Sequence, residues 1–264
     1  MRPLKPGIEV DYTSITELPG QRCSHEQLAR LYHRYRFALQ YSAGKDVLEV
    51  GCGAGPGLGY LAKLARRVVG GDFAHANLQR AQEYYKEKIP LVRMDGQSLP
   101  FADGSFDMVL LFEAIYYLPF PEKFIEESHR VLRKSGALLI CTVNREWADF
   151  NPSAFSTSYL SASELAACLR QKGFDVEMFG AFLASTETFK EKLVSALKRS
   201  AVKLGLIPKN MKNKGLLKRI FFGRLEGLPP EVTEGLTRYT PPLPILSETP
   251  QSEYKIIYAV GLLR

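Results

Sequence analysis

Residues 47–59, VLEVGCGAGPGLG, join an apolar run containing Glu49 to glycines at alternate positions from Gly51 onward. Glycine lacks a Cβ atom and tolerates positive φ angles, so such a loop turns sharply and lets a ligand approach its backbone. In open α/β sheets, ligands bind beyond the carboxyl ends of the strands. The stretch therefore predicts a cofactor site after a buried strand, for either a dinucleotide or an adenosyl compound.

The spacing of the glycines distinguishes these two cofactor classes. The dinucleotide fingerprint GxGxxG requires glycine at its sixth position, but that position holds Pro56, Leu58 or Tyr60, depending on the starting glycine. What fits is an acidic residue two positions before a GxGxG, and Glu49 is that residue. The three glycines are Gly51, Gly53 and Gly55. A tight turn between strand and helix, without any ligand, is the structural alternative.

Carboxylates also follow the next two predicted strands. Asp72 lies 21 positions after Gly51, where a carboxylate can accept hydrogen bonds from ribose hydroxyls in either cofactor class. Asp95 ends the third predicted strand, where a carboxylate can accept a hydrogen bond from an adenine amino group. Either aspartate alone would be typical of a helix cap or a solvated loop. Their joint placement after successive strands favours the cofactor site.

Hydrophobic periodicity and helix caps indicate the elements that must position these residues. Predicted strands cover 46–51, 67–73, 90–95, 106–113, 137–143, 174–183 and 254–263. Predicted helices cover 27–40, 58–65, 75–88, 121–134 and 164–172. This alternation predicts an α/β fold with a parallel, doubly wound sheet and helices on both faces.

The 264 residues are expected to form a single domain with four parts. These are an N-terminal helical cap (1–42), a cofactor-binding core (43–184), a basic insertion (185–250) and the last strand (251–264). The net charge is +7, and eleven Lys and Arg against three Glu lie between Ser185 and Pro230. A solvated helical face and a surface for an anionic partner are equally good interpretations of this charge.

Composition and cysteine spacing exclude several classes of protein. The four cysteines include no CxxC pair, so we expect neither a disulfide framework nor a zinc site, and we assign no metal. The first residues, MRPLKPGIEVDY, have no apolar core of signal-peptide length. No stretch approaches the roughly 20 apolar residues that a membrane span needs. A cytoplasmic protein is expected.

Five segments form an ordered set: VLEVGCGAGPG, VVGGDFA, MDGQSLPF, FDMVLLFEAIYYL and HRVLRKSGALLI. Together they resemble the motifs of class I S-adenosylmethionine-dependent methyltransferases, and most of all the small-molecule group that includes the ubiquinone and menaquinone biosynthesis methyltransferases. The resemblance covers about residues 44–183 and the last strand. It implies S-adenosylmethionine as cofactor, S-adenosylhomocysteine as product, and a seven-stranded Rossmann-like sheet whose antiparallel last strand lies between the fifth and sixth.

The resemblance also implies which residues contact the cofactor. Glu49 is expected at the methionine end, through water, and Phe112 and Glu113 near the methionine moiety. The helix motif YHRYRF is expected to bring a side chain to the cofactor carboxylate, and the candidates there are Tyr35, Arg34 and Arg36.

At the adenosine end, the resemblance implies that Asp72 holds the ribose and Phe73 packs against the adenine. Asp95 and the backbone of Gly96 would contact the adenine edge. The loop glycines have backbone roles: Gly51 and Gly53 line the cofactor, and Gly55 shapes the turn.

The stretch after the fourth strand holds no histidine, and Tyr116 and Tyr117 stand there as the catalytic candidates. A tyrosine can orient an acceptor but is a poor base at neutral pH unless its pKa is lowered. Core packing and a pocket wall are the equally weighted alternative for this pair. In the predicted acceptor loop 144–159, the candidate substrate contacts are Trp147, Phe150 and Tyr159.

Three hypotheses about function remain open. The first is methyl transfer to oxygen or nitrogen of a polar small molecule, such as a sugar, a glycoside, a natural product or an anionic compound. The second is an RNA or protein methyltransferase that uses the basic insertion; the few aromatic residues for base stacking disfavour nucleic acid. The third is a non-catalytic adenosyl-binding module. The basic insertion could also contact a membrane surface, and the sequence carries no signal for an oligomeric state.

Overall fold

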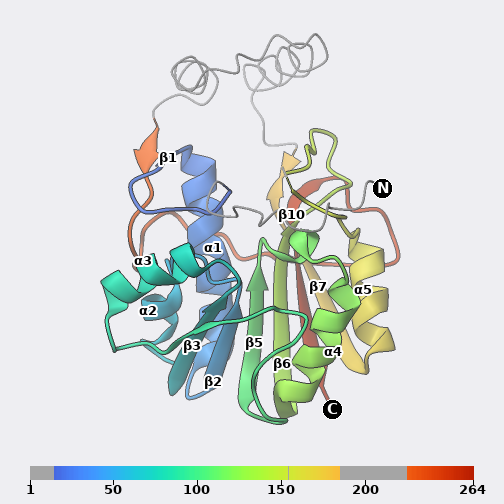
Figure 1. The fold of residues 1–264 in the computed structure, drawn as a ribbon. Helices are drawn as coiled ribbons and strands as arrows, with labels where there is room; N and C mark the ends of the chain where they lie inside the picture. Colours follow the sequence, from blue (N-terminus) through green and yellow to red (C-terminus); the bar gives the residue numbers. More distant parts are fainter. Residues whose placement is uncertain (1–14, 154, 185–224) are drawn as a thin grey trace.

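The computed structural model describes residues 15–153, 155–184 and 225–264, so most of the predicted basic insertion lies outside the described residues (Figure 1). The strands are β1 (Arg22–Cys23), β2 (Asp46–Val50), β3 (Arg67–Asp72), β4 (Leu91–Arg93), β5 (Phe106–Phe112), β6 (Leu132–Val143), β7 (Phe174–Leu183), β8 (Glu226–Gly227), β9 (Leu243–Ile245) and β10 (Tyr254–Leu263). The α-helices are α1 (His25–Ser42), α2 (Leu58–Leu61), α3 (His75–Tyr85), α4 (Pro121–Val131) and α5 (Ala162–Gln171). A short 3₁₀ helix, Ile115–Tyr117, follows β5.

The main sheet has the strand order β4-β3-β2-β5-β6-β10-β7-β9. The pairs from β4 to β6 are parallel, and β10 lies antiparallel between β6 and β7. This confirms the predicted Rossmann-like sheet with its antiparallel last strand. Strand β9 was not expected from the sequence; it pairs with β7 at the edge of the sheet, where Pro244 lies opposite Phe179. A three-residue strand with a central proline gives almost no strand signal, and an edge strand tolerates proline.

Two apolar layers cover the two faces of the sheet, because alternate residues of a strand point to opposite faces. On one face, Val47 of β2 belongs to a core shared with α1, α2 and α3. On the other face, Leu48 and Val50 belong to a core shared with α4 and α5. The helices are therefore distributed over both faces, as the doubly wound pattern predicted (Figure 1). None of the helices in the described part of the chain has the length and apolar composition for crossing a membrane.

Helix α4 is shorter than the sequence predicted. It ends at Val131 rather than at residue 134, and β6 begins immediately at Leu132, which pairs with Phe106 of β5. Arg133 then leaves the helical path to form ion pairs with Asp46 and Asp107. These contacts come from strands distant in the sequence, so the local helix pattern could not show them.

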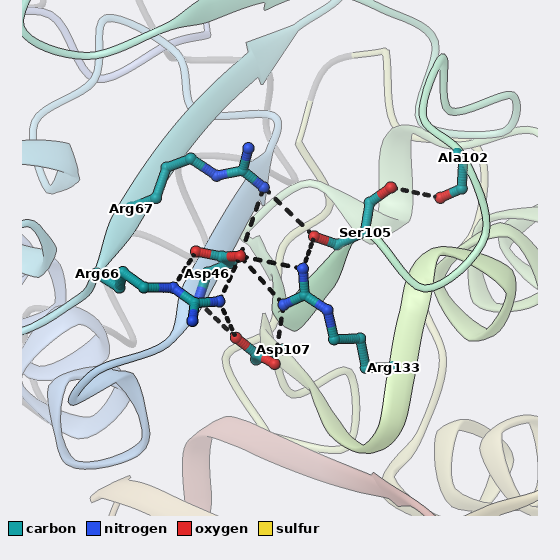
Figure 2. A network of polar contacts seen from close by, with 7 residues as sticks. All are labelled: Asp46, Arg66, Arg67, Ala102, Ser105, Asp107 and Arg133. Atoms are coloured by element: carbon teal, nitrogen blue, oxygen red, sulfur yellow. Dashed lines mark hydrogen bonds and ion pairs between the residues drawn. The ribbon is translucent and has the colours of Figure 1, made fainter.

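Three arginines surround Asp46 at the start of β2, at the opposite end of that strand from the glycine loop (Figure 2). Arg66 donates from Nε and Nη2 to the two carboxylate oxygens at 2.9 and 2.6 Å, and Arg133 donates at 3.1 Å. Hydrogen bonds from Arg66, followed by those from Arg133, lower the pKa of Asp46 to about 2 against the opposing effect of burial. The cluster ties together the starts of β2, β3, β5 and β6.

Asp46→Asn should lower the midpoint of thermal unfolding by several degrees at pH 7, because the amide leaves the arginines without their central carboxylate. The folded-state pKa of Asp46 is lowered, so its stabilisation is complete above about pH 4 and is lost as the pH falls towards 2. Circular dichroism melts between pH 7 and 3 should show the two proteins converging on the acid side. Asp103→Asn, at an exposed ion pair, is the control and should change the midpoint little. Equal midpoints for Asp46→Asn and the unaltered protein at pH 7 would contradict this role.

Candidate cofactor site

A cavity of about 450 Å³ lies at the carboxyl ends of β2, β3, β4 and β5, and side chains of α1 and of residues 15–17 also line it. This volume is within the usual range for small-molecule sites. The cavity brings together most of the residues expected from the sequence: Tyr35, Glu49, Gly51, Gly53, Asp72, Phe73, Asp95, Gly96, Phe112, Glu113, Tyr116 and Tyr117. Four others do not line it: Gly55, Trp147, Phe150 and Tyr159.

The glycine loop turns with positive φ angles at Gly51 (70°), Gly53 (59°) and Gly55 (76°). L-residues rarely adopt this conformation, so the alternating glycines are a backbone requirement. A Cβ atom on Gly53 would also lie 3.0 Å from the Thr16 methyl group above the loop. Gly55 sits behind the lining, where its carbonyl accepts a hydrogen bond of 2.7 Å from the Tyr85 hydroxyl.

Asp72 fixes the loop from the end of β3. One carboxylate oxygen accepts from the Gly53 amide at 2.8 Å, and the other accepts from the Ala74 amide at 2.8 Å and from Asn77 at 3.3 Å. Burial raises the pKa of Asp72, while these three donors lower it. A carboxylate has about four acceptor positions, so capacity remains for one further donor such as a ribose hydroxyl.

Glu49 is 1% exposed and faces the cavity from β2. Tyr35 of α1 donates to its Oε1 at 2.7 Å, whereas Oε2 has no hydrogen-bond partner among the described residues. Burial raises the pKa of Glu49 to about 7, against the hydrogen bond from Tyr35 and the charge of Arg34. Gly57 makes the Tyr35 contact possible, since a Cβ atom there would lie 1.9 Å from the tyrosine ring.

Of the two arginines expected near the cofactor carboxylate, Arg34 lines the cavity. Arg34 is 6% exposed and pairs with Glu17, and its Nε has no partner among the described residues. Burial opposes its charge, but Glu17 and Glu113 raise the pKa of Arg34 above its usual value. Arg36 instead pairs with Glu234, 3.5 Å away, because residues two apart on a helix do not share a face.

The end of β5 brings a second carboxylate into the cavity. Glu113 follows the strand with a φ of 52°, an uncommon conformation for a residue other than glycine. The Tyr116 hydroxyl donates to Glu113 Oε2 at 3.0 Å. Burial raises the pKa of Glu113 while Arg34 and Arg30 lower it, and burial also raises the pKa of Tyr116. Tyr116 is therefore a protonated donor at neutral pH, and Glu113 is the group that can take up a proton.

Two aromatic residues of the predicted acceptor loop, Tyr159 and Phe150, pack behind Tyr116 rather than lining the cavity. Tyr159 stacks on Tyr116 with ring centroids 4.4 Å apart, and Phe150 packs edge-on against Tyr159 at 4.7 Å. Tyr117 shares a hydrogen bond of 2.7 Å with Ser153. The loop therefore buttresses the two catalytic candidates.

At the other end of the cavity, Phe73 is 50% exposed beside Asp95, Gly96 and Asn77. Asp95 accepts hydrogen bonds from the backbone and side-chain amides of Gln97. Asn77 donates to Thr16 and Asp72, but its Oδ1 is buried without a partner among the described residues.

Glu17, Arg30 and Asn77 line the cavity but were missed in the sequence analysis. Arg30 could have been found, because it precedes Arg34 by one helical turn and shares its face. Glu17 and Asn77 carry no local motif, and tertiary contacts alone bring them to the site. Within the ranges that the structure describes, no three His, Cys, Asp or Glu side chains gather as metal ligands would.

The cavity thus suits an adenosyl amino acid. Buried polar atoms of three lining residues, Glu49, Asn77 and Arg34, have no hydrogen-bond partner within the described part of the chain. The unpartnered oxygen of Glu49 could accept a hydrogen bond from an ammonium group, and the guanidinium of Arg34 could donate to a carboxylate. Asp72 could accept a hydrogen bond from a ribose hydroxyl.

Comparison with known proteins agrees with this geometry. The family model for a methyltransferase domain matches residues 48–140. A probable S-adenosylmethionine-dependent methyltransferase of Mycolicibacterium smegmatis is 37% identical over 154 residues, which cover 56% of this chain and 56% of that protein. Another, from Mycobacterium tuberculosis, is 36% identical over 190 residues, which cover 67% of this chain and 68% of that protein.

A phthiotriol/phenolphthiotriol dimycocerosates methyltransferase of Mycobacterium ulcerans is 37% identical over 126 residues, covering 47% of this chain and 44% of that protein. The chain thus spans between 44% and 68% of the length of these curated relatives. Among solved structures, an S-adenosylmethionine-dependent methyltransferase of Thermotoga maritima, described as a possible histamine N-methyltransferase, aligns with a TM-score of 0.57 at 17% identity over 90% of this chain and 91% of that one. At 17% identity, this structural similarity indicates a shared fold and nothing further.

The motifs, the fold and the 36% identity across two thirds of the M. tuberculosis relative lead to one conclusion: the chain belongs to the S-adenosylmethionine-dependent methyltransferases.

Proposed function

We propose that this chain transfers the methyl group of S-adenosylmethionine to a hydroxyl oxygen of a small molecule. The observation that carries the proposal is the contact between Glu113 and Tyr116, in the same cavity as Glu49 and Asp72. When bound, the cofactor supplies a methyl group that its sulfonium already activates. The protein has to align the acceptor and remove its proton.

The residues that would hold the cofactor lie at both ends of the cavity. Glu49 offers to the ammonium group an oxygen that has no hydrogen-bond partner among the residues that the structure describes, and Arg34 offers its guanidinium to the carboxylate. Asp72 has capacity left for the ribose, and the half-exposed ring of Phe73 suits the adenine. The cofactor assignment comes from the family, and these residue roles are part of the proposal.

Glu113 favours oxygen over nitrogen as the acceptor atom. A hydroxyl must lose its proton during transfer, while a neutral amine does not need a base for the attack. Glu113 can take that proton because burial raises its pKa, and Tyr116 holds its carboxylate in place. Tyr116 and Tyr117 are then positioning residues rather than bases, because the pKa of each is raised, chiefly by burial.

The acceptors to be tested are sugars, glycosides and other natural products with hydroxyl groups. The name of the M. ulcerans relative adds a triol lipid to this set. An RNA or protein acceptor, or contact with a membrane surface, would depend on the basic segment within 185–224, outside the described residues.

Binding of S-adenosylhomocysteine should strengthen as the pH rises from 6 to 8. Glu49, with a pKa of about 7, ionises over this range and can then pair with the ligand's ammonium group. Titration calorimetry at pH 6, 7 and 8 should show this slope in the unaltered protein. Glu49→Gln should weaken binding about tenfold at pH 8 and remove most of the slope.

The control for this titration is Glu122→Gln, an exposed residue of α4 outside the cavity, which should keep both the affinity and its pH dependence. A pH slope that survives in Glu49→Gln would rule out Glu49 as its source.

Glu113→Gln should lower kcat about 10²–10⁴-fold on a hydroxyl acceptor and change S-adenosylhomocysteine affinity much less. The reason is that the amide cannot accept the proton. The measurement is S-adenosylhomocysteine release with matched alcohols and amines. For the unaltered protein, kcat should rise with pH through the raised pKa of Glu113, and Tyr116→Phe should keep this acid limb at a lower rate. Methylation of the amines alone, or an unchanged rate in Glu113→Gln, would overturn the proposal.

A further inference from the structure

Arg30 is a second arginine in the cavity, and the cofactor contacts proposed above do not use it. It lies one helical turn before Arg34 on α1, and both side chains line the cavity. The two arginines differ in the carboxylates on which their charges act. The charge of Arg34 lowers the pKa of both Glu49 and Glu113, whereas Arg30 acts on Glu113. Arg30 therefore lies within electrostatic reach of Glu113, the proposed proton acceptor.

Aromatic rings from two other elements border the Arg30 guanidinium. Its central carbon lies 5.8 Å from the ring centroid of Trp147 and 5.7 Å from that of Phe182. Trp147 belongs to the loop between β6 and α5, and Phe182 to β7. Ring faces attract a cation without neutralising it.

Among the described residues, one carboxylate contacts the Arg30 guanidinium, and it is shared with Lys255. Glu26 bonds Arg30 through Oε1 and the Lys255 ammonium through Oε2, the latter at 3.0 Å. The Nε of Arg30 is buried and has no hydrogen-bond partner among the described residues. An arginine has five N–H donors in a planar fork, so most of this fork is left for a ligand.

We propose that Arg30 binds an anionic group of the acceptor, a carboxylate or a phosphate, in a subsite of the cavity beside the guanidinium that Trp147 and Phe182 contact. This inference rests on the proposed methyl transfer and narrows its acceptor to small molecules with both a hydroxyl and an anionic group. The planar fork of arginine matches the oxygens of either anion. Trp147 does not line the cavity, but its ring contacts the Arg30 guanidinium and can therefore report on a ligand bound there.

Trp147 provides the readout, because it is the only tryptophan in the chain. The full chain, saturated with S-adenosylhomocysteine, is titrated with sodium phosphate and separately with sodium acetate, while tryptophan fluorescence is followed. Sodium chloride at matched ionic strength is the blank. We expect a saturable change with at least one of the two anions, and the stronger of them identifies the group as phosphate or carboxylate.

Arg30→Gln should raise the apparent dissociation constant of that anion at least tenfold, and Arg30→Lys should keep a weaker saturable response. Arg36→Gln, at an arginine of the same helix outside the cavity, should behave like the unaltered protein. If Arg30→Gln does not fold, the contrast between Arg30→Lys and Arg36→Gln carries the test.

Two results would overturn the subsite: no saturable response beyond the chloride blank, or an equal response in Arg30→Gln. A tenfold loss of S-adenosylhomocysteine affinity in Arg30→Gln would also overturn it, because Arg30 would then belong to the cofactor. The titration needs no turnover. If S-adenosylhomocysteine does not bind, the proposed function fails, while the same anion titration on the free protein still tests Arg30.

Discussion

The hydrogen bond from the Gly53 amide to Asp72 joins two neighbouring strands at the edge where the cavity lies. The same carboxylate accepts from Ala74, where α3 begins, and from Asn77 one turn later. One side chain thus fixes the path of the glycine loop, the start of a helix and the orientation of an amide in the cavity. The positive φ angles of the loop direct the Gly53 N–H towards β3. The hydrogen bond to Asp72 therefore depends on the glycines that allow this loop conformation.

Helix α1 supplies the positively charged side chains that the strands do not bring to the cavity. The strands carry carboxylates into the cavity, and a site made of these alone would have no group for the carboxylate of an amino acid. One face of α1 adds Arg30, Arg34 and the Tyr35 hydroxyl. Burial raises the pKa of Glu49, and the donor on Tyr35 and the charge of Arg34 both favour its ionised form. The helix therefore adjusts the charge of the site as well as closing it.

The parts of the site that the sequence predicted have local causes. A buried parallel strand followed by glycines, and an aspartate at the end of the next strand, can each be recognised from residues adjacent in the sequence. The roles of Arg30 and Glu17 depend on how α1 packs over distant strands, which no local pattern contains. Gly57 illustrates the difference: it looks like one more glycine of the loop, yet the space it leaves is filled by the ring of Tyr35, 22 positions earlier.

The helices and strands show the same difference between local and tertiary causes. β10 was predicted from its strongly apolar sequence and the family pattern, whereas β9 and the early end of α4 follow from pairing partners elsewhere in the chain. Propensity describes a segment in isolation, and tertiary pairing overrides it where the segment is short or lies next to an ion-pair cluster.

The position of β10 has a consequence for how the chain acquires its fold during synthesis. β6 and β7 are made early, but both pair with β10, which the ribosome makes only after residues 184–253. Until then, two long apolar strands expose unpaired backbone groups at the centre of the future sheet, where they can pair with other chains. Closing the sheet is thus a late, non-local step of high contact order, and the nascent chain is most exposed to misassembly while the stretch before β10 is being translated.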